Sequence, residues 1–355
     1  MGGLIIGIFR KIFGDLPEEL TTVMEKVSRD GHYDYSNMFV MLIAAFLPLI
    51  FASSVGPEAG LTGVIVGLCY WIGDNLKYAR EHEREYSKIG EAVTLEVLFG
   101  APLFGIFAVE EDDIGTEDFV LLKPAKLVLY GSAIAGGLIA VDLLTKFFGA
   151  AMGGFPSFAE VSLQGADYVA MIPYVLCGVV MAYVFEISEK LMGRASGMLP
   201  PVVCETVCGL LLGIGITFVP MVAFSGEEQM GELSGGFMSY TPAILIGIAL
   251  LKIIMTTMCI KLGMKGGHFF PLIFACVCMG FGVGMLLFGA DIGHLVFAAG
   301  CVSASCLGAQ MRKPLAVALL CLLCFPFKMV FFLFFAATIG AWVTKRANVE
   351  ATVDS

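Results

Sequence analysis

Long apolar runs, separated by short stretches rich in glycine, proline or charge, extend over almost the whole chain. They lie at Met38–Ala52, Leu61–Ile72, Ala92–Val109, Phe119–Phe148, Tyr168–Phe185, Val202–Phe224, Ala243–Leu262, Leu272–Phe288, Leu295–Leu307, Leu315–Phe327 and Val330–Val343. Several runs are too short to cross the ~30 Å of hydrocarbon in a bilayer, which takes about 20 helical residues. The pattern predicts an all-α polytopic membrane protein in which some helices are re-entrant or cross only half of the bilayer.

Two of the interruptions have a special form. Gly56–Gly60 (GPEAG) and Gly266–Pro271 (GGHFFP) each precede a predicted buried helix directly, so each places a helix N-terminus at membrane depth. A helix N-terminus leaves up to four N–H groups without partners, and lipid offers them none. Open amides and the positive end of the helix dipole favour an anion. The two breaks therefore predict a path for a small anion, since broken helices in corresponding positions mark transporter binding sites.

The chain also contains a weak internal repeat. The first break is followed by Ala101–Ile106 and the second, at nearly the same distance, by the similar Lys313–Ala318. We therefore expect a single transmembrane domain over residues 1–355, built from two oppositely oriented halves of about 1–160 and 161–346, with a short polar tail at 347–355.

The ends of the chain carry basic residues. Met1–Phe13 is too short to span a membrane and has no small-residue cleavage site, so we interpret it as the tail of a helix and not as a signal peptide. A short helix is predicted from Asp15 to about Arg29. Basic residues near both ends and in the charged segment 74–88 predict cytoplasmic termini by the positive-inside rule.

Composition supports a membrane protein and excludes several other classes. The chain is 58% hydrophobic and only 15% charged, far from the roughly 25% charged residues of soluble domains. Its net charge of −10 argues against nucleic acid as a partner. No nucleophile–base or metal-ligand spacing lies inside the helices, so we expect no enzyme, no metal and no cofactor. The 11 cysteines lie in or beside apolar runs; even Cys321 and Cys324, at redox-pair spacing, are interpreted as packing residues.

Glu58 is the strongest single candidate. A carboxylate at the bilayer centre costs about 2.5–3.5 kcal/mol on insertion scales, so a functional role is the default interpretation. At a helix N-terminus its charged form can occupy the amides that would hold an anion, and protonation removes the charge that keeps it there. Glu58 and an anion then compete for one site, which makes permeation depend on pH. The alternative is a capping acid in an interfacial turn.

The remaining anion contacts are expected from the backbone. Glycines let the main chain approach an ion closely, and successive N–H groups supply the donors. The candidates are Gly56, Ala59, Gly60, Gly266, Gly267, His268, Phe269 and Phe270. His268 is expected to act through its amide, and Phe269 to narrow the path or, alternatively, to face lipid.

These motifs, in this order, resemble those of the CLC family of chloride channels and proton-coupled chloride transporters. GGHFFP is similar to the family's GGxFxP filter, and GPEAG to its GxExP element with the gating glutamate. Phe13–Pro17 resembles the early GSGxP segment, which implies anion contacts at Gly14 and Leu16. Gly14 stands where the family has a serine, Pro57 replaces a donor, Gly60 replaces a proline, and no residue matches the family's inner tyrosine. The resemblance implies an inverted-repeat bundle and a homodimer with one pore per subunit.

The resemblance also implies an inner proton-transfer acid after Ala101–Ile106. Counting from that landmark indicates Glu111 or Asp112 within the cluster Glu110–Asp113, although a solvated acidic loop would explain the cluster nearly as well. The expected function is transport of chloride or a similar small anion across a prokaryotic plasma membrane, gated by protonation of Glu58 and coupled to proton exchange. The alternatives are a passive voltage- or pH-gated channel and a degenerate, non-transporting relative.

Overall fold

The computed structural model describes residues 1–17, 33–75, 83–101, 103–114, 123–148, 156–158, 161 and 165–353. The β pairing in these residues is one isolated antiparallel bridge between Gly56 and Gly267; the regular elements are helices. The α-helices are α1 (Gly2–Phe13), α3 (Met38–Ile50), α4 (Glu58–Asn75), α5 (Glu83–Phe99), α6 (Phe104–Glu110), α7 (Pro124–Phe148), α8 (Gly165–Ser196), α9 (Pro201–Phe218), α10 (Glu227–Gly236), α11 (Pro242–Lys261), α12 (Phe269–Phe288), α13 (Ile292–Met311), α14 (Pro314–Cys321) and α15 (Val330–Val353). The short 3₁₀ turns are η2 (Glu111–Asp113), η4 (Pro220–Val222), η5 (Phe237–Ser239) and η6 (Phe327–Met329).

The helix lengths fit a membrane protein. In the described part of the chain, 7 helices are long and apolar enough to cross a bilayer, namely α7, α8, α9, α11, α12, α13 and α15. Others, such as α3, α6 and α14, are too short to span upright, as the short apolar runs predict. The chain is a multi-pass, all-α membrane protein.

Several predicted boundaries differ from the structure. The run at Tyr168–Phe185 lies inside the much longer α8, because the charged residues after it continue the helix beyond the apolar part. The run at Val202–Phe224 ends as a helix at Phe218, just before Pro220 begins η4. The described parts of the charged segment 74–88 are helical as well, at the end of α4 and the start of α5. The helix predicted between Asp15 and Arg29 falls largely on residues outside those described.

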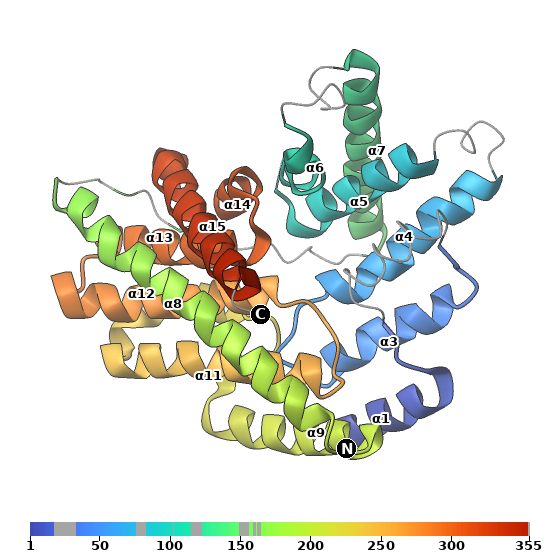
Figure 1. The fold of residues 1–355 in the computed structure, drawn as a ribbon, viewed down its shortest axis with the longest axis horizontal. Helices are drawn as coiled ribbons and strands as arrows, with labels where there is room; N and C mark the ends of the chain where they lie inside the picture. Colours follow the sequence, from blue (N-terminus) through green and yellow to red (C-terminus); the bar gives the residue numbers. More distant parts are fainter. Residues whose placement is uncertain are drawn as a thin grey trace.

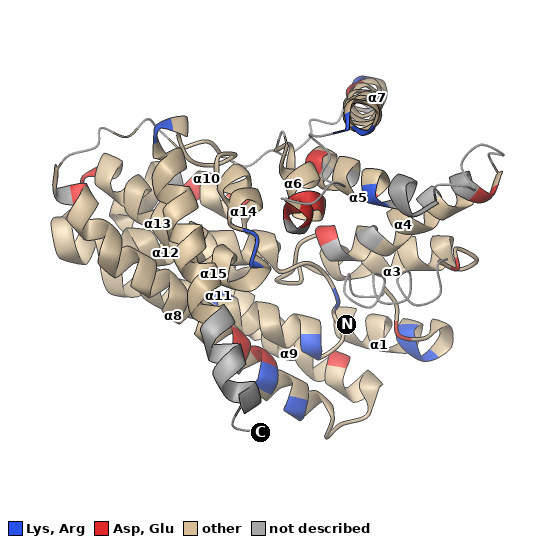
Figure 2. Ribbon diagram, turned by 45° about the horizontal axis from the view of Figure 1, so that its top comes forward, with Lys and Arg blue, Asp and Glu red and all other residues tan. Residues whose placement is uncertain are grey.

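The core is built around α12 and α13. Helix α13 packs against α8, α12 and α15, and α12 packs between α13 and α11 (Figure 1). Neither α12 nor α13 contains a Lys, Arg, Asp or Glu, whereas charged residues gather on α1, α5 and the turn after α6 (Figure 2). Close contact depends on glycine: a Cβ on Gly280 would lie 2.4 Å from the Cα of Ala299. The glycines of α12 are therefore packing residues.

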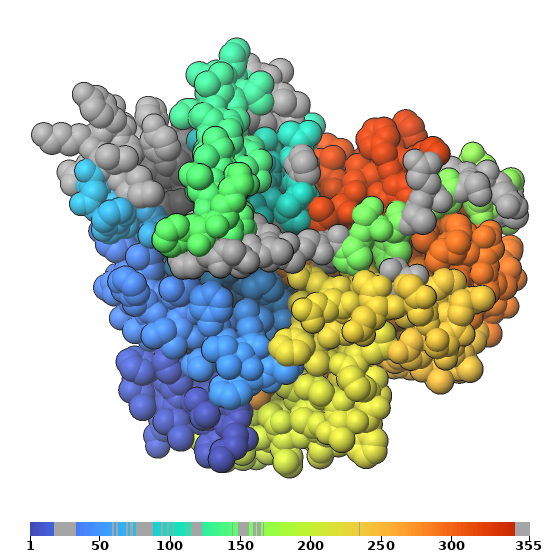
Figure 3. All heavy atoms as spheres, turned by 180° about the vertical axis from the view of Figure 1, so that it is seen from behind, coloured from blue at the N-terminus to red at the C-terminus, as the bar shows by residue number. Residues whose placement is uncertain are grey.

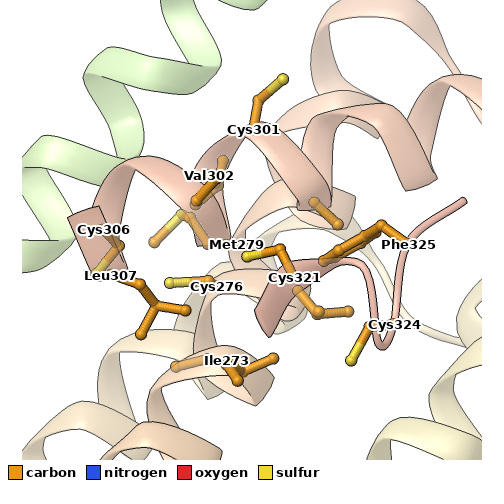
Figure 4. Packing of buried hydrophobic residues seen from close by; sticks show 14 of the residues in the cluster. Ile273, Cys276, Met279, Cys301, Val302, Cys306, Leu307, Cys321, Cys324 and Phe325 are labelled. Carbon is orange, nitrogen blue, oxygen red and sulfur yellow. The ribbon is translucent and has the colours of Figure 1, made fainter. Parts of the chain in front are cut away.

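The cysteines belong to this core. Cys276, Cys301, Cys306, Cys321 and Cys324 lie together with Ile273, Met279 and other apolar side chains from α12, α13 and α14 (Figure 4). The ten cysteines whose side chains are described are all free thiols. Their surroundings are those of packing residues.

The N-terminal helices lie beside the middle of the chain. Seen from behind, α1, α3 and α4 in blue adjoin the yellow segment that contains α9 and α11 (Figure 3). Helix α1 packs on α9, where Arg10 forms an ion pair with the buried Glu205. Helix α7 stands apart from the core in Figure 1 and exposes apolar side chains along its length, among them Val128, Ile139 and Phe147.

Candidate functional site

Two helix N-termini from distant parts of the sequence meet at the two breaks. The first break follows α3 and opens α4 at Glu58, and the second follows α11 and opens α12 at Phe269. Gly56 and Gly267 join them by a pair of backbone hydrogen bonds: each N–H donates to the other's carbonyl oxygen, at 2.8 and 2.7 Å. This bridge fixes the start of α4 against the start of α12.

The carboxyl group of Glu58 lies at the N-terminus of α12. Its Oε1 accepts the backbone N–H of Phe269 at 2.9 Å, and the side chain is only 4% exposed. The N–H groups of Phe270 and of Glu58 itself also favour the charged form of this carboxyl group. The side chain thus occupies a cup of backbone amides where the helix dipole favours negative charge. We call the N–H groups of Phe269, Phe270 and Glu58 the amide cup.

Glycine is required around this carboxyl group because the main chain approaches it so closely. A Cβ on Gly267 would lie 1.9 Å from Cδ of Glu58, and one on Gly56 would lie 2.0 Å from Oε2. Gly266 is crowded in the same way by Val55, and Gly60 by Ala45 on α3.

Aromatic rings close one side of the cup. Phe270 stacks on Phe99, at the end of α5, with ring centroids 4.7 Å apart, and Phe269 meets the same ring edge-on at 6.5 Å. The imidazole of His268 packs on Phe185 of α8 at 5.2 Å and on Phe269 at 4.5 Å. Phe269 therefore faces other aromatic side chains of the protein. The backbone of Ala59 lies in the first turn of α4, beside these groups.

Gly14 and Leu16 are linked to the second break through the residue between them. Asp15 forms ion pairs with Arg10 and with Lys265, the residue before Gly266, the second at 2.8 Å. The N–H of Gly14 donates to the carbonyl of Arg10 and that of Leu16 to the carbonyl of Gly14, both at 2.9 Å. Both amides are thus engaged within their own segment.

The acidic cluster after α6 is held by several other elements. Both carboxyl oxygens of Glu111 accept backbone N–H groups at the start of α14, those of Leu315 at 2.9 Å and Ala316 at 2.8 Å. Fully buried Glu110 accepts from the hydroxyl of Tyr130 at 2.7 Å and pairs with Lys126 at 2.7 Å. The structure describes the backbone of Asp112 within η2 but not its side chain.

Two residues near the cup were not singled out from the sequence. Phe99 could have been suspected because it ends α5 directly before the interruption at Gly100. Lys252, a cation in the middle of the apolar α11, gave the same kind of signal as Glu58, since an ionisable side chain inside a membrane helix is expensive. His294 lies in the first turn of α13, with its ring between Asp167 and Tyr174 at 2.6 and 2.5 Å.

The arrangement suits ion binding through the backbone. Among the residues that the structure describes, no group of His, Cys, Asp and Glu is placed to hold a metal ion. The amide cup can bind either a carboxylate or a free anion, but not both at once. Protonation of Glu58 removes the charge that holds its side chain in the cup.

Comparison with known proteins places these features in one family. Residues 2–345 match the family model described as voltage gated chloride channel. The voltage-gated ClC-type chloride channel ClcB of Escherichia coli O9:H4 (strain HS) is 25% identical over 305 residues, which cover 82% of this chain and 68% of that protein.

Two solved structures share the fold. A CLC-type fluoride/proton antiporter superposes with a TM-score of 0.67 at 17% identity, covering 97% of this chain and 90% of its own. A slow cyanobacterial Cl⁻/H⁺ antiporter gives 0.68 at 18% identity, covering 90% and 76%.

Proposed function

Because the chain belongs to the voltage gated chloride channel family, we propose that it carries chloride or a similar small anion across the membrane, in exchange for protons, with Glu58 as the gate. The carboxylate of Glu58 closes the amide cup. When it is protonated, it leaves, and an anion takes the same donors.

The observation that carries this proposal is the hydrogen bond from the Phe269 N–H to Oε1 of Glu58 at 2.9 Å. Glu58 begins α4 and binds the N-terminus of α12, more than 200 residues further along the chain, and its buried side chain lies where the two glycine-flanked breaks meet. Of the two breaks, the N-terminus of α12 is the more favourable place for an anion, because of the helix dipole and the buried amides there.

Exchange is favoured over passive conduction by one observation: the solved structures that share this fold are named as a fluoride/proton and a Cl⁻/H⁺ antiporter. A titratable side chain in the anion site provides a means of coupling the two ions, since each departure of the carboxylate takes up one proton. A passive channel gated by Glu58 is the second candidate.

The test is flux from liposomes that contain the purified protein, with chloride and proton electrodes read together. As chloride leaves the liposomes, we expect protons to enter them. We also expect chloride efflux to rise as pH falls, because protonation releases the Glu58 side chain from the amide cup. Glu58→Gln should keep chloride efflux and lose both proton movement and pH dependence. Proton coupling that persists in Glu58→Gln would rule out the gating role.

We also propose a homodimer in the plasma membrane, as the family resemblance implies, with the apolar surface of α7 in contact with lipid or with the partner subunit. Most side chains of this helix are exposed in the single chain, including Leu138, Ile139 and Leu143. Single-molecule photobleaching in liposomes should show two steps for each particle, and one step would contradict the dimer.

A further inference from the structure

Lys252 is a fully buried cation in the middle of a membrane helix. It lies near the centre of α11 (Pro242–Lys261), and its side chain is 0% exposed. Its Nζ donates to three successive backbone carbonyls, those of Val222, Ala223 and Phe224, at 3.2, 3.1 and 2.6 Å. In the described residues no carboxylate lies within ion-pair distance of this nitrogen.

The geometry assigns the ammonium form to Lys252. An ammonium has three N–H donors and no acceptor, which matches three carbonyl oxygens around one nitrogen. A neutral amine has only two N–H groups, and its lone pair would face the third oxygen. A buried charge without an opposite charge costs several kcal/mol. A negative charge nearby would stabilise this ammonium further.

Two sets of contacts connect Lys252 with the segments that form the amide cup. Nζ lies 5.5 Å from the centre of the Phe274 ring, and Phe274 follows the first residue of α12 by about 8 Å of helix. On the other side, the N–H of Phe224 donates to the carbonyl of Ala52 at 3.3 Å, just before the first break.

A third contact joins the same helix to the first break. Thr256, one turn after Lys252 on α11, exchanges a hydrogen bond with Ser54 at 3.2 Å, and both hydroxyls are buried. The charge of Lys252 is therefore fixed relative to both helix N-termini that form the cup.

We propose that Lys252 is the fixed positive charge that balances whatever anion occupies the amide cup and thereby sets the affinity for that anion. The counter-charge is the carboxylate of Glu58 in the closed state and the transported anion once Glu58 is protonated. This proposal rests on the proposed function. In general, at an effective dielectric constant near 20, a unit charge on the order of 10 Å from a monovalent anion changes the affinity for that anion by about ten-fold.

A purely structural role predicts a different outcome. As a clamp on three carbonyls, Lys252 would stabilise the turn after α9, and its charge would not affect an ion in the cup. A substitution of Lys252 that removes its charge but keeps hydrogen-bond donors distinguishes the two roles.

The experiment is calorimetric titration of chloride, at a pH acidic enough to protonate Glu58 so that its carboxylate does not compete, into detergent-purified protein with Lys252→Gln and Lys252→Arg, using Lys146→Gln as the control. Gln keeps N–H donors without the charge, Arg keeps the charge, and Lys146 is an exposed lysine of α7. We expect a dissociation constant about ten-fold higher in Lys252→Gln and within about three-fold of wild type in Lys252→Arg. Lys146→Gln should bind as wild type does.

Each result has a distinct meaning. Wild-type affinity in a folded Lys252→Gln variant overturns the proposal for Lys252 and leaves the proposed function intact. A wild-type protein that neither binds chloride nor moves it in liposomes defeats the proposed function itself. Should Lys252→Gln not fold, the ¹⁵Nζ signal of Lys252 in the wild type decides: a chemical-shift change on titration with chloride supports the proposal, and a signal that chloride does not change overturns it.

Discussion

At the scale of single residues, the site depends on how closely one carboxyl group approaches the main chain. Oε1 of Glu58 is at hydrogen-bond distance from the Phe269 N–H only because Gly56 and Gly267 have no side chains. Any Cβ at position 267 would occupy the space of the Glu58 carboxyl carbon. Gly267 thus leaves room for the carboxyl group of Glu58.

This crowding predicts the effect of Gly267→Ala. The added methyl group should push the Glu58 side chain out of the cup, so chloride efflux should lose most of its dependence on pH, and overpacking should lower stability by about 1–3 kcal/mol. Chloride efflux at acidic and neutral pH, together with thermal unfolding, measures both effects. The matched control is Gly247→Ala on α11, where a Cβ meets nothing within 4 Å. Wild-type pH dependence in Gly267→Ala would contradict the account.

At the scale of elements, the acids after α6 act on another helix. Glu111 accepts two backbone N–H groups at the start of α14 and therefore caps a helix from the other half of the chain. Glu111 and Asp112 were the two candidates for the inner proton acid. With both oxygens of Glu111 engaged, we propose that Asp112 carries the proton.

Substituting Glu111 and Asp112 one at a time tests which of them carries the proton. Glu111→Gln should lower the free energy of unfolding by about 1 kcal/mol, because the amide nitrogen cannot accept the second N–H, and proton coupling should remain. Asp112→Asn should remove proton movement and keep chloride efflux. The measurement is the ratio of proton to chloride flux in liposomes, combined with denaturation. The reverse pattern, with coupling lost only in Glu111→Gln, would show that the cap is also the proton carrier.

The sequence was most informative where local signals were strong. Glycine flanking at Glu58 and Phe269 marked both breaks, and the apolar runs gave nearly all of the helices. It was less informative where tertiary contacts decide. Glu111 becomes a cap only because α14 folds against α6, and the contact of Phe99 with Phe270 requires α5 to reach α12. The end of α8 was missed because charged residues outside the apolar run still form helix.

At the scale of the whole molecule, the fold places next to each other segments that lie far apart in the sequence. The bridge between Gly56 and Gly267 and the packing of α6 on α14 join segments from the two predicted halves at two places, one beside the amide cup and one at the acidic cluster. The amide cup and the acidic cluster thus both adjoin the core of α11, α12 and α13.

The most direct measurement is a crystal structure of Glu58→Gln grown in bromide, with anomalous diffraction recorded for bromide. The account predicts an anomalous peak within hydrogen-bond distance of the Phe269 amide, at the position of the Glu58 carboxyl group in the wild type. Bromide bound only elsewhere, with the space beside the Phe269 N–H empty or filled by the substituted side chain at saturating bromide, would contradict it.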